Sequence, residues 1–399
     1  MAEKDRIADY LTEIPNFLSV FIFSIFFYIA SPILIEISKS TNIAITNLSF
    51  IFTFFSIGAF IGQMTSVFFN RRFRKLNIVL AGFIIQILLT IILSFSSNLI
   101  LFYIMYVISG YTLGVIWIQA NEYILESKIK NKERLITITV TFFPIGAFIA
   151  PFISSLIIEA GLSWRFVYYI IILLISINII LYIFILGRKK EILIIRNEEK
   201  LPPKDIFINK SKNLILIFVL LAVFFYSCSE TVVATWVPSF FRLARNLTVQ
   251  TASLTLNLFW LFIIIGRAIT LILAGRIKST KIMIAISILA IISLIGVILV
   301  NNKYLIFVLI SIVGLGYSAM FPLLYFTGAT LYEKGKGMLA TFLFISLNIG
   351  KAIAPFITKY TSKISLELSV SFSFIFMLIV TIIVILITFL LKKDHSYSY

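Results

Sequence analysis

The chain has 399 residues, of which 60% are hydrophobic and 13% are charged, and its formal net charge at pH 7 is +17. Soluble globular domains carry about 25% charged residues, so this composition excludes a soluble globular protein and indicates a chain that crosses a membrane many times. The chain has one cysteine, Cys228, which excludes an intramolecular disulfide and a cysteine metal cluster. Its one histidine, His395, lies in the C-terminal tail, which argues against metal catalysis by histidine and against a histidine relay inside the membrane.

Apolar runs long enough to cross a bilayer recur along the chain. A transmembrane helix needs about 20 predominantly apolar residues. In the first half such runs cover 17–37, 47–69, 77–96, 99–121, 135–159 and 165–187, and in the second half 213–237, 250–275, 282–300, 304–326, 338–358 and 368–391. We therefore predict an all-α polytopic membrane protein with twelve transmembrane helices, six in each half.

The most polar stretch, residues 188–212, lies between the halves, and 12 of its 25 residues are charged. We predict an N-terminal six-helix bundle over 1–187, a cytoplasmic central loop over 188–212 and a C-terminal six-helix bundle over 213–399. Cytoplasmic loops collect Lys and Arg. With the N-terminus in the cytoplasm, 25 basic residues lie on the cytoplasmic side and seven on the other, so both termini are predicted to be cytoplasmic. This distribution explains the net charge without a nucleic-acid partner.

Similar segments occur in both halves at an offset of 204 residues. GAFIAPFI at 146–153 and GKAIAPFI at 350–357 share six of eight residues. The same offset pairs two further glycines of each half, Gly62 with Gly266 and Gly110 with Gly314. With six spans per half, both repeats enter the membrane in the same direction, which is the layout of parallel transporter repeats. The residues predicted to pack and bend helices are Gly146, Pro151, Gly350 and Pro355.

Short motifs carry a family resemblance over nearly the whole chain. They are FTFFSIGAFIG at 52–62, QANEYI at 119–124, the stretch 134–151, WRF at 164–166, TWVPSF at 235–240 and NLFWLFIIIG at 257–266. With these motifs the chain resembles the major facilitator superfamily, and within it the TsgA-like proteins and, more distantly, the fucose permeases. The resemblance implies two parallel six-helix repeats in the major facilitator fold and a transporter of the bacterial inner membrane.

Two positions depart from the patterns of these families. Ser66 stands where the superfamily usually has an Asp before its basic cluster, so the charged latch of that loop is missing. Trp117 and Glu122 stand where the fucose permeases have a Glu and a Pro, which argues against their proton mechanism.

Ionisable residues inside the spans are the main candidates for chemistry, because each costs about 2.5–3.5 kcal/mol to insert. Glu230 lies in the polar patch 226–231, roughly 24 Å from Leu214 at about 1.5 Å per residue and so in the outer part of the hydrocarbon core. It is either a proton-coupling carboxylate or a structural hydrogen-bond or ion-pair partner. Lys351 lies near the middle of its span, where it either binds an anionic or polyhydroxy solute, pairs with Glu230 or extends to the membrane surface.

Other polar and aromatic residues are candidates with two open interpretations each. Arg267 and its repeat mate Gln63 are either gate residues or solute ligands. Gln119 and Asn121 end the fourth span and are further candidates for solute contact. Trp117, Tyr317 and Tyr325 either stack on a solute or pack inside the protein.

No Walker-type Gly-x-x-x-x-Gly-Lys-Ser/Thr and no Gly-x-Ser-x-Gly sequence occurs, so we expect no ATP use, no enzyme, no catalytic residue, no metal and no cofactor. We predict a secondary active transporter that moves a small polar, sugar-like solute by alternating access, with proton coupling through Glu230 as an option. The expected partners are the solute, the lipid bilayer and protons. The alternatives are an efflux permease for amphipathic compounds and a non-transporting membrane sensor or scaffold.

Overall fold

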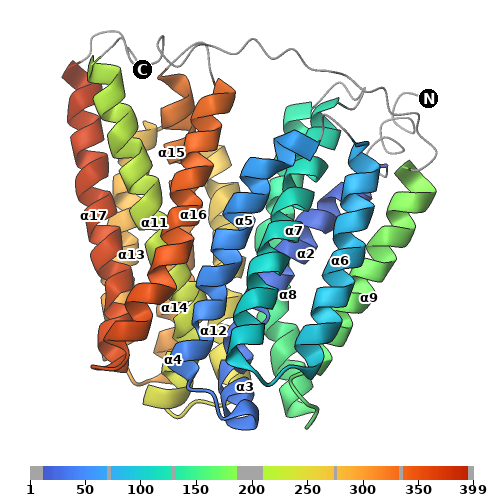
Figure 1. The fold of residues 1–399 in the computed structure, drawn as a ribbon. Coiled ribbons are helices and arrows are strands. Elements are labelled where there is room, and N and C mark those ends of the chain that lie inside the picture. The colour runs from blue at the N-terminus through green and yellow to red at the C-terminus, as the bar shows by residue number, and fades with distance from the viewer. Residues whose placement is uncertain are drawn as a thin grey trace. The chain divides into compact units, whose positions relative to one another are not determined.

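A computed structural model describes residues 12–69, 73–126, 132–186, 210–273, 276–331 and 336–393 (Figure 1). Every regular element in these ranges is a helix, and twelve helical segments are long and apolar enough to cross a membrane. The predicted all-α class with twelve spans is therefore confirmed. Of the predicted central loop 188–212, residues 188–209 lie outside the described ranges, and the last three residues already belong to the next helix.

Six spans come from the first half of the chain. Its helices are α2 (Ile14–Tyr28), η1 (Ser31–Ile33), α3 (Leu34–Thr41), α4 (Ile45–Leu48), α5 (Phe50–Phe69), α6 (Lys75–Phe95), α7 (Leu99–Glu126), α8 (Lys132–Glu159), α9 (Phe166–Leu181) and η2 (Tyr182–Leu186). The first span is interrupted after Tyr28 and continues through η1 into α3. At this interruption Ser154 of α8 donates a hydrogen bond to the carbonyl oxygen of Ile29 at 2.7 Å.

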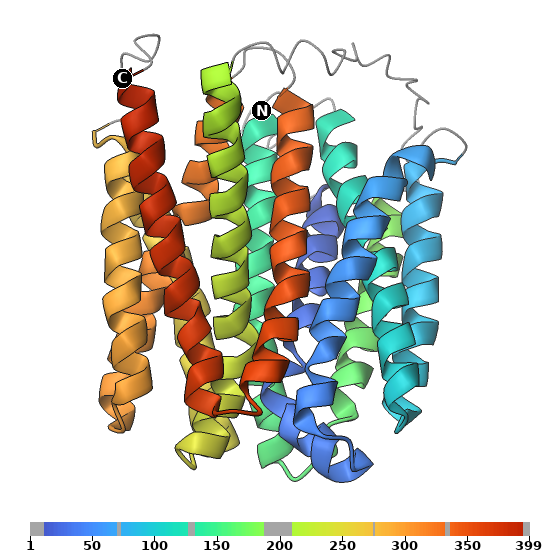
Figure 2. The same cartoon turned by 60° about the vertical axis from the view of Figure 1, so that its left-hand side comes forward.

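Six spans come from the second half. Its helices are α11 (Lys210–Ala244), α12 (Val249–Leu273), α13 (Ser279–Leu299), α14 (Lys303–Tyr317), α15 (Met320–Thr330), α16 (Lys336–Thr361) and α17 (Leu366–Lys393). The tenth span is interrupted between α14 and α15. Figure 2 shows α11, in yellow-green, between α17, in red, and α16, in orange.

The chain divides into two compact units. One contains Met1–Ile195 with Val249–Asn257, and the other contains Arg196–Thr248 with Leu258–Tyr399. Within the first unit, α2 packs against α8 and α9, and α6 packs against α7 and α9. Within the second, α11 packs against α16 and α17, and α13 packs against α14 and α17. Counted as spans, the two sets of neighbours are the same, as expected for two copies of one six-helix unit.

Glycines related by the 204-residue offset occupy matching helix crossings. A Cβ atom built on Gly110 would lie 2.0 Å from the carbonyl oxygen of Phe55, and one built on Gly314 would lie 2.4 Å from that of Phe259. Phe55 and Phe259 are themselves 204 residues apart. Only a residue without a side chain lets the two backbones approach so closely, so the repeated glycines mark a repeated crossing of the second span by the fourth and of the eighth by the tenth.

The glycines of the second repeated segment also lie at close helix crossings, each against the first helix of the same half of the chain. A Cβ atom on Gly146 would lie 2.7 Å from the carbonyl oxygen of Phe21 in α2, and one on Gly350 would lie 2.5 Å from that of Phe224 in α11. The helices α8 and α16 continue through Pro151 and Pro355. The predicted packing role of the glycines is therefore visible in the contacts, while bending at the prolines stays a prediction.

Candidate functional site

The candidate site is built around Glu230, whose side chain is 6% exposed on α11. Tyr226, one turn earlier, donates a hydrogen bond from its hydroxyl to Glu230 Oε1 at 2.7 Å. Side chains four residues apart lie on the same face of an α-helix, so the spacing itself brings the two groups together. The other carboxylate oxygen, Oε2, makes no hydrogen bond to a described residue.

Glu230 lies nearer the middle of its helix than the sequence suggested. The predicted span ends at residue 237, but α11 passes through Pro238 and ends at Ala244. A proline is tolerated inside a membrane helix when neighbouring groups satisfy the freed backbone. At about 1.5 Å per residue, Glu230 is roughly 30 Å from the first residue of α11 and roughly 21 Å from the last.

The interruption of the tenth span lies at the same place. The Tyr226 hydroxyl is 3.3 Å from the carbonyl oxygen of Tyr317, the last residue of α14. Arg267 of α12 donates from Nε to the carbonyl oxygen of Ser318 at 3.2 Å. Carbonyl groups at a helix end lack intrahelical partners, and in a membrane the protein must supply them. A cation at the C-terminal end of α14 also complements the helix dipole.

Two basic side chains act on the Glu230 carboxylate. Arg267 and Lys351, on α12 and α16, both interact with it electrostatically. Lys351 is 9% exposed and Arg267 is half-buried. The terminal Nη groups of Arg267 make no hydrogen bond within the described ranges. The site therefore contains one acid and two bases drawn from three helices.

A chain of hydroxyl groups extends the site toward α17. The Tyr317 hydroxyl forms a short hydrogen bond with Ser229 Oγ, and Ser229 Oγ donates to the carbonyl oxygen of Ser373 at 2.5 Å. The rings of Tyr226 and Tyr317 lie 5.7 Å apart between centroids. The sequence singled out Tyr317 but not the roles of Tyr226, Ser229, Ser318 and Ser373. The spacing of Tyr226 and Glu230 was the one local signal available.

Four candidates from the sequence belong to the first unit, and three of them contact residues of that unit. Gln119 donates to Ser66 Oγ at 2.8 Å, which joins α7 to α5 by a neutral pair at the position where the family pattern expects an Asp. Asn121 donates to the carbonyl oxygen of Trp117 at 2.8 Å in its own helix. The Trp117 ring packs edge-on against Phe23 at 5.0 Å. Gln63 is half-buried on α5.

Tyr325 lies in the second unit but has aromatic neighbours of its own. Its ring is 6.2 Å from that of Phe321 and 6.4 Å from that of Phe344. Its hydroxyl makes no hydrogen bond to a described residue. The Tyr325 ring therefore packs against two aromatic rings of its own unit, and a role in stacking on a solute stays a prediction.

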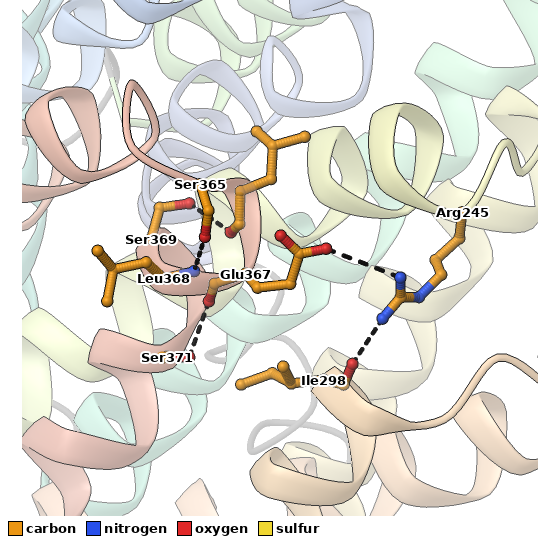
Figure 3. A network of polar contacts seen from close by, with 8 residues as sticks. Arg245, Ile298, Ser365, Glu367, Leu368, Ser369 and Ser371 are labelled. Atoms are coloured by element: carbon orange, nitrogen blue, oxygen red, sulfur yellow. Dashed lines mark hydrogen bonds and ion pairs between the residues drawn. The ribbon is translucent and has the colours of Figure 1, made fainter.

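A second polar network fixes the end of α11 (Figure 3). Arg245 Nη2 donates to the carbonyl oxygen of Ile298 in the last turn of α13 at 2.6 Å, and Arg245 Nη1 lies 3.8 Å from Glu367 Oε1 in the first turn of α17. The backbone N–H of Leu368 donates to Ser365 Oγ at 2.9 Å, which caps α17. The network ties the helix that carries Glu230 to two neighbours.

The chemistry open to the site is proton exchange and ion binding. A carboxyl group beside two cations changes its net interaction with both when it gains or loses a proton. Among the residues that the structure describes, no group of three or more His, Cys, Asp or Glu could hold a metal ion.

Comparison with known proteins gives a family match over most of the chain. The family model described as "Major Facilitator Superfamily" matches residues 17–355. A "Protein TsgA homolog" from Buchnera aphidicola subsp. Baizongia pistaciae is 26% identical over 257 residues, 63% of this chain and 62% of the relative. In a second such homologue, from the Schizaphis graminum subspecies, the match covers 59% of the relative, so this chain spans about 60% of these curated proteins.

Other matches cover more of the chain. "Glucose/mannose transporter GlcP" from Bacillus subtilis is 22% identical over 82% of this chain and 81% of its own length. Among solved structures, a bacterial homologue of the human lysosomal transporter Spinster is similar with a TM-score of 0.75, at 12% identity over 97% of this chain and 98% of that one. A D-xylose-proton symporter is similar with a TM-score of 0.73, at 12% identity over 95% and 97%. These structures confirm the expected fold, and the family match confirms the resemblance read from the motifs.

Proposed function

Because the chain belongs to the major facilitator superfamily, we propose that it is a proton-coupled secondary transporter of a small polyhydroxy solute and that Glu230 is its coupling residue. The two six-helix repeats move solute by alternating access rather than by chemistry on it, so the protein acts neither as an enzyme nor as an ATPase. The bilayer, the solute and protons are its partners.

One observation carries this proposal. A buried carboxyl group, Glu230, is hydrogen-bonded to Tyr226 and lies in the field of Arg267 and Lys351 beside an interrupted span. Ionisable side chains inside membrane spans are costly, and in pumps and transporters they mark proton relays. Glu230 of α11 interacts with three other helices. Tyr226 connects it to the end of α14, and electrostatic interaction connects it to Arg267 of α12 and Lys351 of α16.

The sugar-like substrate is supported by the relatives. One curated relative is named a glucose/mannose transporter and one structural neighbour a D-xylose-proton symporter. Interrupted membrane helices lining a site near the middle of the bilayer are the usual binding elements of such transporters. We further propose that the protein lies in a bacterial inner membrane with both termini in the cytoplasm, supported by the 25 basic residues on that side against seven on the other.

The test is transport in proteoliposomes with D-glucose, D-mannose and D-xylose as first probes. We expect an imposed pH gradient to drive accumulation in the wild type. In Glu230→Gln, accumulation should fall at least tenfold while counterflow, which needs no proton, continues. Glu367→Gln is the matched control, because that carboxylate is 47% exposed and lies at the start of α17.

Two results would argue against the proposal. Proton-driven accumulation that survives in Glu230→Gln removes this residue from coupling. The second result is loss of both counterflow and accumulation in Glu230→Gln at a Tm within about 2 °C of the wild type. The variant is then folded, and Glu230 acts in solute binding rather than in proton coupling alone.

A second candidate function, efflux of amphipathic compounds, is favoured by an apolar groove on the second unit. The groove has a volume of about 330 Å³ and is lined by α11 and α16, with Ile217, Leu220, Phe224, Phe342 and Ile345 among its residues. This is the lower end of the size of small-molecule sites, about 300–1,000 Å³. Expression in a drug-sensitive host tests it: resistance to lipophilic cations that is lost in Leu220→Trp would favour efflux over sugar transport.

A further inference from the structure

We propose that the solute is an anion, a sugar acid or sugar phosphate, and that Arg267 and Lys351 bind its negative group. This inference names the substrate class of the transport function proposed above and rests on it. Two observations support this inference. The buried Lys351 and the half-buried Arg267 each interact electrostatically with Glu230, and the Nη groups of Arg267 make no hydrogen bond to a described residue.

Arg267 is held in a position suited to an anion. Its Nε is anchored by the hydrogen bond to the Ser318 carbonyl oxygen at the interruption of the tenth span. The two Nη groups point their N–H donors at no described acceptor. A guanidinium group presents its donors in a planar fork that matches carboxylate and phosphate geometry. With Nε fixed by the backbone, the fork is oriented before the solute arrives.

Lys351 adds a charge that the fold does not require. Its repeat mate is Ala147, which is completely buried in α8 at the matching helix position. The same crossing is therefore built in the first unit with a methyl group. A lysine at this position in α16 has a role beyond packing, and attraction of an anion is a role that uses its charge.

The charge balance also favours an anion. Among the described residues the cluster contains two cations, Arg267 and Lys351, and one acid, Glu230, which is a net charge of +1 when the carboxylate is ionised and +2 when it is protonated. A neutral sugar leaves all of this charge uncompensated in a low-dielectric site, whereas a sugar acid lowers it by one charge and a sugar phosphate, which carries about −1.5 to −2 at pH 7, lowers it by nearly two. The cluster thus discriminates between an acidic sugar and its neutral parent.

Glu230 then couples proton and solute by charge alone. An ionised Glu230 repels a bound anion, so anion binding favours the protonated form, and protonation favours anion binding by the same factor. Solute anion and proton therefore bind together. A glutamine at this position imitates the protonated form and should bind the anion without dependence on pH.

The experiment compares D-glucuronate and D-glucose 6-phosphate with D-glucose, which shares their ring and lacks the charge. Half-saturating concentrations are measured by thermal shift on the full chain and by counterflow in proteoliposomes. We expect the acidic sugars to saturate at concentrations at least tenfold lower than glucose. Arg267→Gln and Lys351→Gln should each remove this advantage, and the exposed control Arg276→Gln should keep it.

The outcomes separate this inference from the proposed function. If glucose saturates at the same or a lower concentration than both acidic sugars, or if the advantage survives in both variants, the anion site is wrong, even where proton-driven glucose uptake is intact. If the acidic sugars bind through Arg267 and Lys351 while Glu230→Gln still accumulates solute on a pH gradient, the anion site stands and the coupling role of Glu230 falls. The inference is also wrong if neither acidic sugar binds at 10 mM, a concentration that corresponds to a binding free energy of about −2.7 kcal/mol.

Discussion

Tyr226 is the residue that connects Glu230 to the interrupted span. Its hydroxyl bonds to the carboxylate at 2.7 Å and lies 3.3 Å from the Tyr317 carbonyl oxygen, so its removal uncouples the acid from the helix end. A hydrogen bond to a charged group contributes about 1.5–3 kcal/mol. We therefore expect Tyr226→Phe to lower proton-driven transport roughly 10- to 100-fold, as measured in proteoliposomes.

The matched control is Tyr325→Phe. This substitution removes a hydroxyl from the same unit that has no hydrogen-bond partner among the described residues, and the ring contacts with Phe321 and Phe344 remain. Transport at the wild-type rate is expected. Equal losses in both variants would show that the tyrosine hydroxyls act on packing and not through Glu230.

Arg245 and Glu367 differ in how much each contributes to stability. Arg245 bonds to a carbonyl at the end of α13 and lies 5.3 Å from the ring centre of Phe240, whereas Glu367 is 47% exposed and 3.8 Å from its partner atom. Exposed ion pairs contribute about 0–1 kcal/mol, while a buried acceptor left unpaired costs about 1–3 kcal/mol. Arg245→Gln should therefore lower the Tm more than Glu367→Gln, and the reverse order would contradict the network in Figure 3.

At the scale of the helices, the close crossing of α7 over α5 depends on Gly110. A methyl group there would approach the Phe55 carbonyl oxygen to 2.0 Å, and neither backbone can yield without moving a helix. Overpacking of this kind costs about 1–3 kcal/mol. Gly110→Ala is expected to lower the Tm by several degrees. Gly82→Ala is the control, because the nearest atom there is the flexible Ile116 Cδ1 at 3.0 Å, and it should leave the Tm nearly unchanged.

The whole chain consists of two similar six-helix units, and we propose that the segment 188–209 only tethers them. Residues 1–198 and 199–399 expressed as separate chains should therefore associate and restore proton-driven transport to within about threefold of the intact protein. Each half has its own buried apolar core, which is the requirement for independent folding of a bundle. Failure of the two halves to co-purify, with each half folded alone, would show that the connection does more than hold them together.

The sequence alone determined the class of protein, the number of spans and the repeat. These follow from properties that are local or periodic: about 20 apolar residues cross a bilayer wherever they occur, and a glycine at a helix crossing is needed in both copies of a duplicated unit. It also singled out Glu230, Lys351 and Arg267, because a charge in an apolar run is costly on its own and so is visible without a structure.

Only the tertiary structure decided which of these residues act together. Glu230, Arg267 and Lys351 lie on three different helices and are separated by 37 and 84 residues in the chain, so no spacing rule joins them. Gln119, Asn121 and Trp117 looked equally polar or aromatic, yet each has a partner in its own unit. The interruption at Tyr317 and Ser318 was hidden inside an apolar run, because what stabilises it are the side chains of Tyr226 and Arg267, which reach its carbonyl groups from other helices.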